Sequence, residues 1–273
     1  MRARRLLAAV VLAAASATAA DPAPAPASPE APAAEPAAST PDASEIARRA
    51  EWVLRGDGSA LEATLMVVRE GKKPRVLAFR VWDDPLGDRV RVRILPPAPS
   101  AGSILLKLPP VLWSFEPKDG VTRHVPRAAW LDAWMRSEFT LDDLVHGSGA
   151  DAYAQRLLRV DERAGPDGGT RAWVIESTPR VLPPVAWGRL VDWIDCEHAT
   201  LLRREFYAAS GALVRSLVLE DLREVAGRRF PHLWVIRSAA DPARESRIRI
   251  DSVRFDPHFE AGSFAPRNLR PAD

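Results

Sequence analysis

The feature that most constrains the fold is an alternation of apolar and polar side chains with a period of two, which recurs through most of the chain after residue 58. In residues 88–95 it is unbroken, with Val90, Val92 and Ile94 on one face and three arginines on the other. Successive side chains of a β-strand point to opposite faces of a sheet. This segment is therefore predicted to be a strand with one buried face.

The same reasoning predicts about a dozen strands. They span residues 61–67, 77–81, 88–95, 103–108, 111–116, 153–160, 171–178, 189–196, 201–208, 213–221, 229–237 and 245–255. Turn signals such as Lys118-Asp119-Gly120 and Ser210-Gly211 separate several of them. Many short strands with few helices indicate a mainly β fold, built as one large antiparallel sheet that curves on itself. Hairpins between consecutive strands make a meander the simplest topology.

One helix is predicted before the strands, with Asp42 as its N-cap, Glu45 in its first turn and Gly56 at its end. Two more interrupt the strands within residues 126–149. The first spans Pro126–Arg136 and the second begins at Thr140. Short apolar helices inserted within a sheet are expected to cover its open apolar face.

Residues 1–43 are predicted to be a targeting segment followed by a spacer. Residues 1–19 combine arginines, an apolar run and small residues at 17–19, which predicts a cleavable signal peptide. No Cys follows the run, so a lipid anchor is not expected. Residues 20–43 are rich in Pro and Ala and are predicted to be a disordered linker. The folded domain is then expected to span residues 44–273.

Composition excludes several classes of protein. The formal net charge is +2, but without Arg2, Arg4 and Arg5 the chain holds 35 Lys and Arg against 36 Asp and Glu, a net charge of −1. This balance argues against nucleic-acid binding. The single Cys excludes an internal disulfide framework and a multi-thiolate metal site.

Catalytic and metal-binding motifs are not found. The five histidines lie at least 22 residues apart, so no pair has the spacing of metal ligands on one turn. Asp142 and Asp143 are better explained as acids that complement the dipole of a helix start. The pattern predicts a binding protein with no catalytic residue, metal or cofactor. A hydrolase that uses Cys196 or the Asp142-Asp143 pair remains a remote alternative.

Three segments occur in an order that points to a known family: residues 111–117 (VLWSFEP), residues 123–126 (RHVP) and residues 139–144 (FTLDDL). The run resembles the outer membrane lipoprotein-sorting proteins, the LolA-like superfamily of periplasmic carriers. In that family a strand of type W-x-Y-x-P precedes an Arg-rich turn, a short helix and a G-S-D-F-x-x-x-D-L motif.

Later segments are also similar to this family, namely residues 173–179, 201–211 and 255–269, so that the resemblance covers almost the whole predicted domain. Two departures stand out. Arg136-Ser137-Glu138 replaces the Gly-Ser-Asp of the family motif, and Ala243-Arg244-Glu245-Ser246 replaces its usual Gly-Lys-x-Thr. A lid region changed in this way is expected to hold a different ligand, or to hold its ligand less tightly.

The resemblance implies a half-barrel of about eleven antiparallel strands, with helices as a lid over an apolar cavity. The residues expected to line the cavity are Leu65, Val67, Phe79, Val81, Val92, Ile94, Trp113 and Phe115. The residues expected to form the lid are Trp130, Trp134, Met135, Phe139, Leu141 and Leu144. Arg93 is the candidate for a latch, since in the family an Arg near a strand end holds the lid by bonding helix carbonyls.

The implied function is that of a non-enzymatic periplasmic carrier for the acyl chains of a lipoprotein or a lipid. The implied partners are an inner-membrane transporter, of the resistance-nodulation-division class, and an outer-membrane acceptor. A second hypothesis is a regulatory protein of the same fold, in which the cavity senses lipid or lipoprotein and acts on a membrane signalling partner. Transfer of the cargo distinguishes the two.

Overall fold

The computed structural model describes residues 41–146, 149–165, 168–181, 187–260 and 262–265. The predicted signal peptide and nearly all of the predicted linker lie outside the described residues. Residues 41–273 cluster as one unit. Helix α1 (Ala43–Arg55) starts and ends as predicted, because the Asp42 carboxylate accepts a hydrogen bond from the Ser44 amide and Gly56 adopts a positive φ of 64° at the C-cap.

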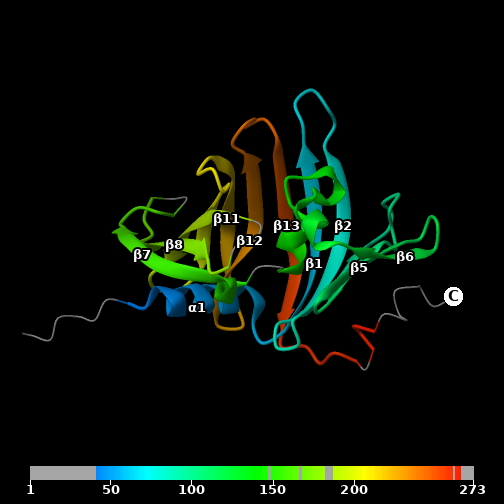
Figure 1. Cartoon of the computed structure of the whole chain (residues 1–273), viewed down its shortest axis with the longest axis horizontal. Helices are drawn as coiled ribbons and strands as arrows, with labels where there is room; N and C mark the ends of the chain where they lie inside the picture. Colours follow the sequence, from blue (N-terminus) through cyan, green and yellow to red (C-terminus); the bar gives the residue numbers. More distant parts are fainter. Residues whose placement is uncertain (1–40, 147–148, 166–167, 182–186, 261, 266–273) are drawn as a thin grey trace, which may run out of the picture. The chain divides into compact units, whose positions relative to one another are not determined.

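Thirteen strands in the described ranges form a single antiparallel sheet (Figure 1). The first six are β1 (Ser59–Val68), β2 (Arg75–Asp84), β3 (Arg89–Ile94), β4 (Ile104–Leu108), β5 (Val111–Glu116) and β6 (Val121–Val125). The remaining seven are β7 (Tyr153–Asp161), β8 (Ala172–Pro179), β9 (Arg189–Asp195), β10 (Leu201–Tyr207), β11 (Leu213–Val225), β12 (Arg228–Ser238) and β13 (Glu245–Phe255). The twelve predicted strands are confirmed, and β6 is an additional one.

The sheet consists of two meanders that meet at one long-range pairing. Its strand order is β6-β5-β4-β3-β2-β1-β13-β12-β11-β10-β9-β8-β7. Strand β1 therefore pairs with β13 in the middle of the sheet, while β6 and β7, which are consecutive in the chain, are the two edges. The sheet is curved and does not close, as Figure 1 shows. The half-barrel prediction is confirmed, with thirteen strands in place of about eleven.

The connection between β6 and β7 carries the remaining helical elements. They are η1 (Arg127–Leu131), η2 (Trp134–Arg136), α2 (Leu141–Val145) and η3 (Ala150–Ala152). The prediction of one helix over Pro126–Arg136 is wrong, because two 3₁₀ segments stand there, separated by extended backbone that forms a β-bridge between Ala133 and Thr140. The cap of α2 is as predicted. The Thr140 hydroxyl accepts from the Asp143 amide, and the Asp143 carboxylate accepts from the Thr140 amide.

We call residues 126–146 the lid segment. Trp130, Trp134 and Phe139 are buried in the main hydrophobic cluster, together with inward residues of β1, β2 and β3. The Trp134 ring meets Phe79 of β2 edge to face, with 5.0 Å between the ring centroids. The lid segment thus packs on one half of the sheet, and α1 packs on the other half, where it contacts β7, β9 and β12 (Figure 1).

The opposite face of the sheet has its own small clusters. Ile104, Leu106 and Phe115 are buried there against Phe264, with Phe259 and Trp113 alongside. A segment that follows β13 in the chain therefore covers the outer face of β4 and β5. This cover explains why Ile104, Leu106 and Phe115 are buried although they lie on the face turned away from the lid segment.

Candidate functional site: a cavity beneath the lid segment

A cavity of about 170 Å³ lies between α1, the lid segment and the inward face of the sheet. Its wall on the sheet side comes mainly from the second meander. The apolar residues contributed by β9 to β13 are Leu190, Ile194, Leu201, Phe206, Leu217, Leu219, Trp234, Ile236, Ile248 and Ile250. A dry cavity of about 150 Å³ holds one benzene molecule. With the lid segment in this position, the cavity therefore has room for an apolar group of about that size.

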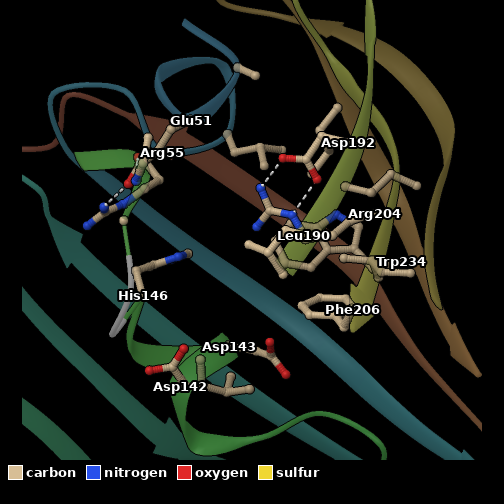
Figure 2. Close-up of a pocket in the computed structure, with 18 of the residues that line it drawn as sticks. Glu51, Arg55, Asp142, Asp143, His146, Leu190, Asp192, Arg204, Phe206 and Trp234 are labelled. Atoms are coloured by element: carbon tan, nitrogen blue, oxygen red, sulfur yellow. Dashed lines mark hydrogen bonds and ion pairs between the residues drawn. The ribbon is translucent and has the colours of Figure 1, made fainter. Parts of the chain in front are cut away.

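Two charged residues interrupt this apolar wall. Arg204 on β10 and Asp192 on β9 are directly opposite each other in the strand register. The Arg204 Nε donates to Asp192 Oδ1 at 2.6 Å, and its Nη2 donates to Oδ2 at 2.8 Å. Figure 2 shows the pair at one side of the pocket, with Asp142, Asp143 and His146 at another. Burial opposes the charged form of the Arg204 guanidinium, but the facing Asp192 carboxylate outweighs it and raises the pKa of Arg204, so the guanidinium stays charged.

A second charged group joins α1 to the sheet at the end of the cavity. Arg55 is buried and donates to both oxygens of Asp83, at 2.8 and 2.9 Å, and to Glu51 at 2.7 Å. The Nε2 of His146, which ends α2, lies 3.5 Å from Asp83. Burial and the nearby Arg55 charge lower the pKa of His146 to about 4, so its imidazole is neutral at pH 7.

The two consecutive carboxyls of α2 differ in their environment. Asp143 is paired with Arg215, whereas the nearest cation to Asp142 is Arg127, at 3.8 Å. Burial, together with the neighbouring Asp143 charge, raises the pKa of Asp142 to about 6. The prediction that both acids complement the dipole of a helix start is therefore incomplete, because Asp143 also forms an ion pair with Arg215.

Two arginines, Arg215 on β11 and Arg69 directly after the end of β1, bond the backbone of the lid segment. The Nη1 of Arg215, on β11, donates to the Glu138 carbonyl at 2.7 Å, and its guanidinium also holds both oxygens of Asp143 at 2.7 Å. The Nη2 of Arg69 donates to the Arg136 carbonyl at 3.0 Å and to the Glu138 carboxylate at 2.9 Å. The lid segment is thus anchored to the sheet at adjacent points by charge-assisted hydrogen bonds.

The two departures from the family motifs meet in space. The Glu138 carboxylate accepts from the Ser246 hydroxyl at 2.7 Å and from the Arg244 Nε at 3.1 Å, and the Ser246 hydroxyl accepts from the Glu138 amide at 3.1 Å. The altered lid motif and the altered entry to β13 therefore form one contact.

The structure brings some of the expected cavity and lid residues together at this site. Phe79, Val81, Phe139 and Leu144 line the cavity. A second pocket of about 240 Å³, under the other end of the lid segment, is lined by further members of the two predicted sets, namely Val92, Ile94, Trp134, Met135 and Leu141. Leu65, Val67 and Trp130 are buried in the main hydrophobic cluster without lining either space.

Trp113 and Phe115 are placed away from the cavity, contrary to the expectation for them. Leu106 pairs with Trp113 and Ile104 with Phe115, and cross-strand partners share a face. That face carries Phe264, so both aromatic residues belong to the outer cluster. Alternation along a strand shows that two faces differ, but does not show which face is inward.

Arg93 is also placed on the outer face, because it pairs with Ile104 across β3 and β4. It therefore faces away from the lid segment, and the expectation that it holds the lid is wrong for this geometry. Arg215 and Arg69 occupy that role of bonding lid carbonyls.

Sequence reasoning missed most of the cavity wall, although a signal was present. Trp234 and Ile236, and likewise Ile248 and Ile250, alternate with polar or outward residues in segments that were predicted as strands. The pairing of β1 with β13 places these strands beside β1 and β2 at the centre of the sheet. This long-range pairing is what makes them line the cavity.

Comparison with solved structures gives the class of fold. The described fold is similar to an outer membrane lipoprotein-sorting protein domain from Vibrio parahaemolyticus, at 18% identity and a TM-score of 0.70, over 83% of this chain and 97% of that one. It is similar to a LolA superfamily protein from Nitrosomonas europaea, at 17% identity and a TM-score of 0.68, over 83% and 98%. A DUF1329 family protein from Desulfovibrio piger matches at 18% identity and a TM-score of 0.73, over 84% and 98%. The fold is LolA-like.

A family model described as "-like: Uncharacterized protein" matches residues 87–271, and the chain belongs to that family. No curated protein matches the chain in sequence. Among the described residues, none of the helices has the length and apolar character needed to cross a membrane.

Proposed function

We propose that the protein is a non-enzymatic periplasmic carrier that binds acyl chains of a lipoprotein or a lipid in the cavity and delivers them towards the outer membrane. The observation that carries this proposal is the apolar cavity between a curved sheet and a lid segment. An acyl chain gains about 0.8 kcal/mol for each methylene removed from water, so a carrier that crosses an aqueous space needs such an enclosure.

Two features of the site support binding and release as opposed to catalysis. The carboxyls Asp143 and Asp192 are each held by two hydrogen bonds from an arginine. Burial raises the pKa of the remote Cys196 thiol, which keeps it protonated and poorly nucleophilic at neutral pH. The proposed partners are an inner-membrane transporter of the resistance-nodulation-division class and an outer-membrane acceptor.

Native mass spectrometry of the exported protein, gently extracted from the periplasm, tests the proposal. The expected result is an added mass of a lipid or lipopeptide, which is lost when the protein is mixed with acceptor vesicles. Retention of the lipid in the presence of vesicles would favour a lipid-sensing regulator. A bare mass, with no uptake of an added lipidated peptide, would contradict both functions.

A further inference from the structure

The Arg204–Asp192 pair is an unusual element in the wall of the cavity. Neighbouring strands β11, β12 and β13 contribute only apolar side chains to that wall, and the residue opposite Arg204 on β11 is Leu217. Two residues further along β10 the wall is again apolar, at Phe206. Placing two charges in an apolar wall costs desolvation energy and is weak evidence for stabilisation. A role in ligand binding explains the pair better.

The geometry of the pair leaves one donor available. Asp192 accepts from the Nε and Nη2 of Arg204, which uses one edge of the guanidinium. Within the part of the chain that the structure describes, no group accepts from Nη1. The Arg204 side chain retains 32% of its accessible surface, and the residue lines the cavity. Figure 2 shows its guanidinium beside Asp192, within the pocket.

The charges around the cavity decide what kind of acceptor fits. Asp192 already neutralises Arg204, Arg55 is shared between Glu51 and Asp83, and Arg215 holds Asp143. Asp142 adds a carboxyl whose nearest cation lies 3.8 Å away. An anionic group would therefore enter a region that already holds more acids than bases. An uncharged carbonyl oxygen meets the open N–H without this repulsion.

We propose that Arg204 is a polar subsite of the cavity and that its Nη1 donates a hydrogen bond to the ester or amide carbonyl of a bound acyl group, while Asp192 fixes the guanidinium in place. The hydrocarbon chain then lies against the apolar wall of β11 to β13. This subsite rests on the proposed carrier function. It adds that the ligand is recognised at its acyl linkage as well as through its chain.

The test compares two uncharged disaccharide detergents with the same twelve-carbon chain. Sucrose monododecanoate has an ester carbonyl, whereas dodecyl maltoside joins its chain through a glycosidic oxygen, called the ether here, and has no carbonyl. Each is titrated below its critical micelle concentration into the full exported chain at pH 7.5. We expect the ester to bind roughly tenfold more tightly, as a single hydrogen bond to a charged donor allows.

The variant to compare is the double replacement Arg204→Met with Asp192→Leu, because removing one partner alone would leave an uncompensated buried charge. In this variant the ratio of the affinity for the ester to the affinity for the ether should fall to about one, while the affinity for the ether is unchanged. The matched control is Arg80→Met with Glu62→Leu, which changes another cross-strand ion pair, 44% and 41% exposed, that does not line the cavity. This control should keep the preference.

The outcomes separate the subsite from the carrier function. Equal binding of ester and ether by the unaltered chain, or a preference that survives the double replacement, would overturn the subsite and leave the carrier proposal standing. Tighter binding of dodecanoate than of the ester would also overturn it, because the recognised group would then be an anion. If the unaltered chain binds neither detergent, both proposals fail.

Discussion

Arg215 and Asp143 form a two-point ion pair that joins β11 to the first turn of α2, with both oxygens of the carboxylate 2.7 Å from guanidinium nitrogens. The Arg215 side chain is 5% exposed and lies over the rings of Trp187 and Phe206. One arginine therefore connects the lid segment to the wall of the cavity. Because the pair is buried, its loss is expected to matter far more than that of a surface pair.

Replacement of Arg215 by Met is expected to lower the free energy of unfolding by about 3 kcal/mol, since Asp143 is then left without its cation in a buried position. With one of its anchors to the sheet removed, the lid segment should open locally more often and be cleaved faster by trypsin at the exposed Arg136. Urea unfolding and limited proteolysis measure the two effects. The control Arg223→Met breaks an exposed pair on the same strand and should cost no more than about 0.5 kcal/mol. Similar losses in both variants would contradict this assignment.

Trp134 is expected to be the main apolar anchor of the lid segment. Its side chain is 3% exposed and packs edge to face on Phe79. Trp134→Ala should lower the free energy of unfolding by about 3–5 kcal/mol through the lost contacts and the cavity left behind. Leu131→Ala, in the same segment but 41% exposed, should change it by less than about 0.5 kcal/mol. Thermal unfolding of the two variants measures both changes in the free energy of unfolding.

Asp142 should make stability depend on pH in an unusual direction. Its pKa is raised to about 6 in the folded protein, above the ordinary value near 4, so the folded state binds the proton more tightly than the unfolded state does. The contribution of this carboxyl to stability is therefore full below about pH 4 and is lost as the pH rises through 6.

Asp142→Asn removes this penalty. The variant should be more stable than the unaltered chain by roughly 3 kcal/mol at pH 7.5 and by no more than about 1 kcal/mol at pH 4.5. The difference between the two proteins at each pH cancels the titration of the other groups. A gain of the same size at both pH values would show that Asp142 does not titrate in this range.

Filling the cavity should impair ligand uptake. Ala50 of α1 lines the cavity, and Ala50→Leu places three more carbon atoms in it. Binding of a twelve-carbon lipid probe should weaken by roughly tenfold, which corresponds to about 1.4 kcal/mol. The control Arg48→Leu introduces the same side chain on the exposed face of the same helix and should leave binding unchanged. Equal probe affinities in all three proteins would place the ligand elsewhere.

Local patterns predicted the elements well because they depend on neighbours in the sequence. The alternation in β3 and the cap residue Asp42 each reflect a local rule of backbone geometry. Strand β6 was missed because its residues are mostly exposed at the edge of the sheet, so that no apolar face marks it. The 3₁₀ segments were mistaken for one helix because Trp130 and Trp134 have helical spacing in the sequence.

The site was harder to predict because it depends on which strands pair across the chain. The pairing of β1 with β13 joins residues nearly two hundred positions apart, such as Leu61 and Val253, and no local pattern encodes it. The inward face of β4 and β5 likewise depends on their register with β3, where Leu106 and Trp113 share the outer face with Arg91. For the same reason, Arg93 could not be distinguished from Arg215 as the arginine that reaches the lid segment.

The lid segment belongs to the connection between β6 and β7, which are the two edges of the sheet. It is therefore attached at both of its ends to the sheet, whereas a flap with a single hinge would be attached at one end only. Displacement of the lid segment from the sheet therefore requires that the two edges approach each other, that the sheet bends, or that the connection extends. Displacement of the lid segment from the sheet is thus mechanically linked to both edge strands of the sheet, β6 and β7.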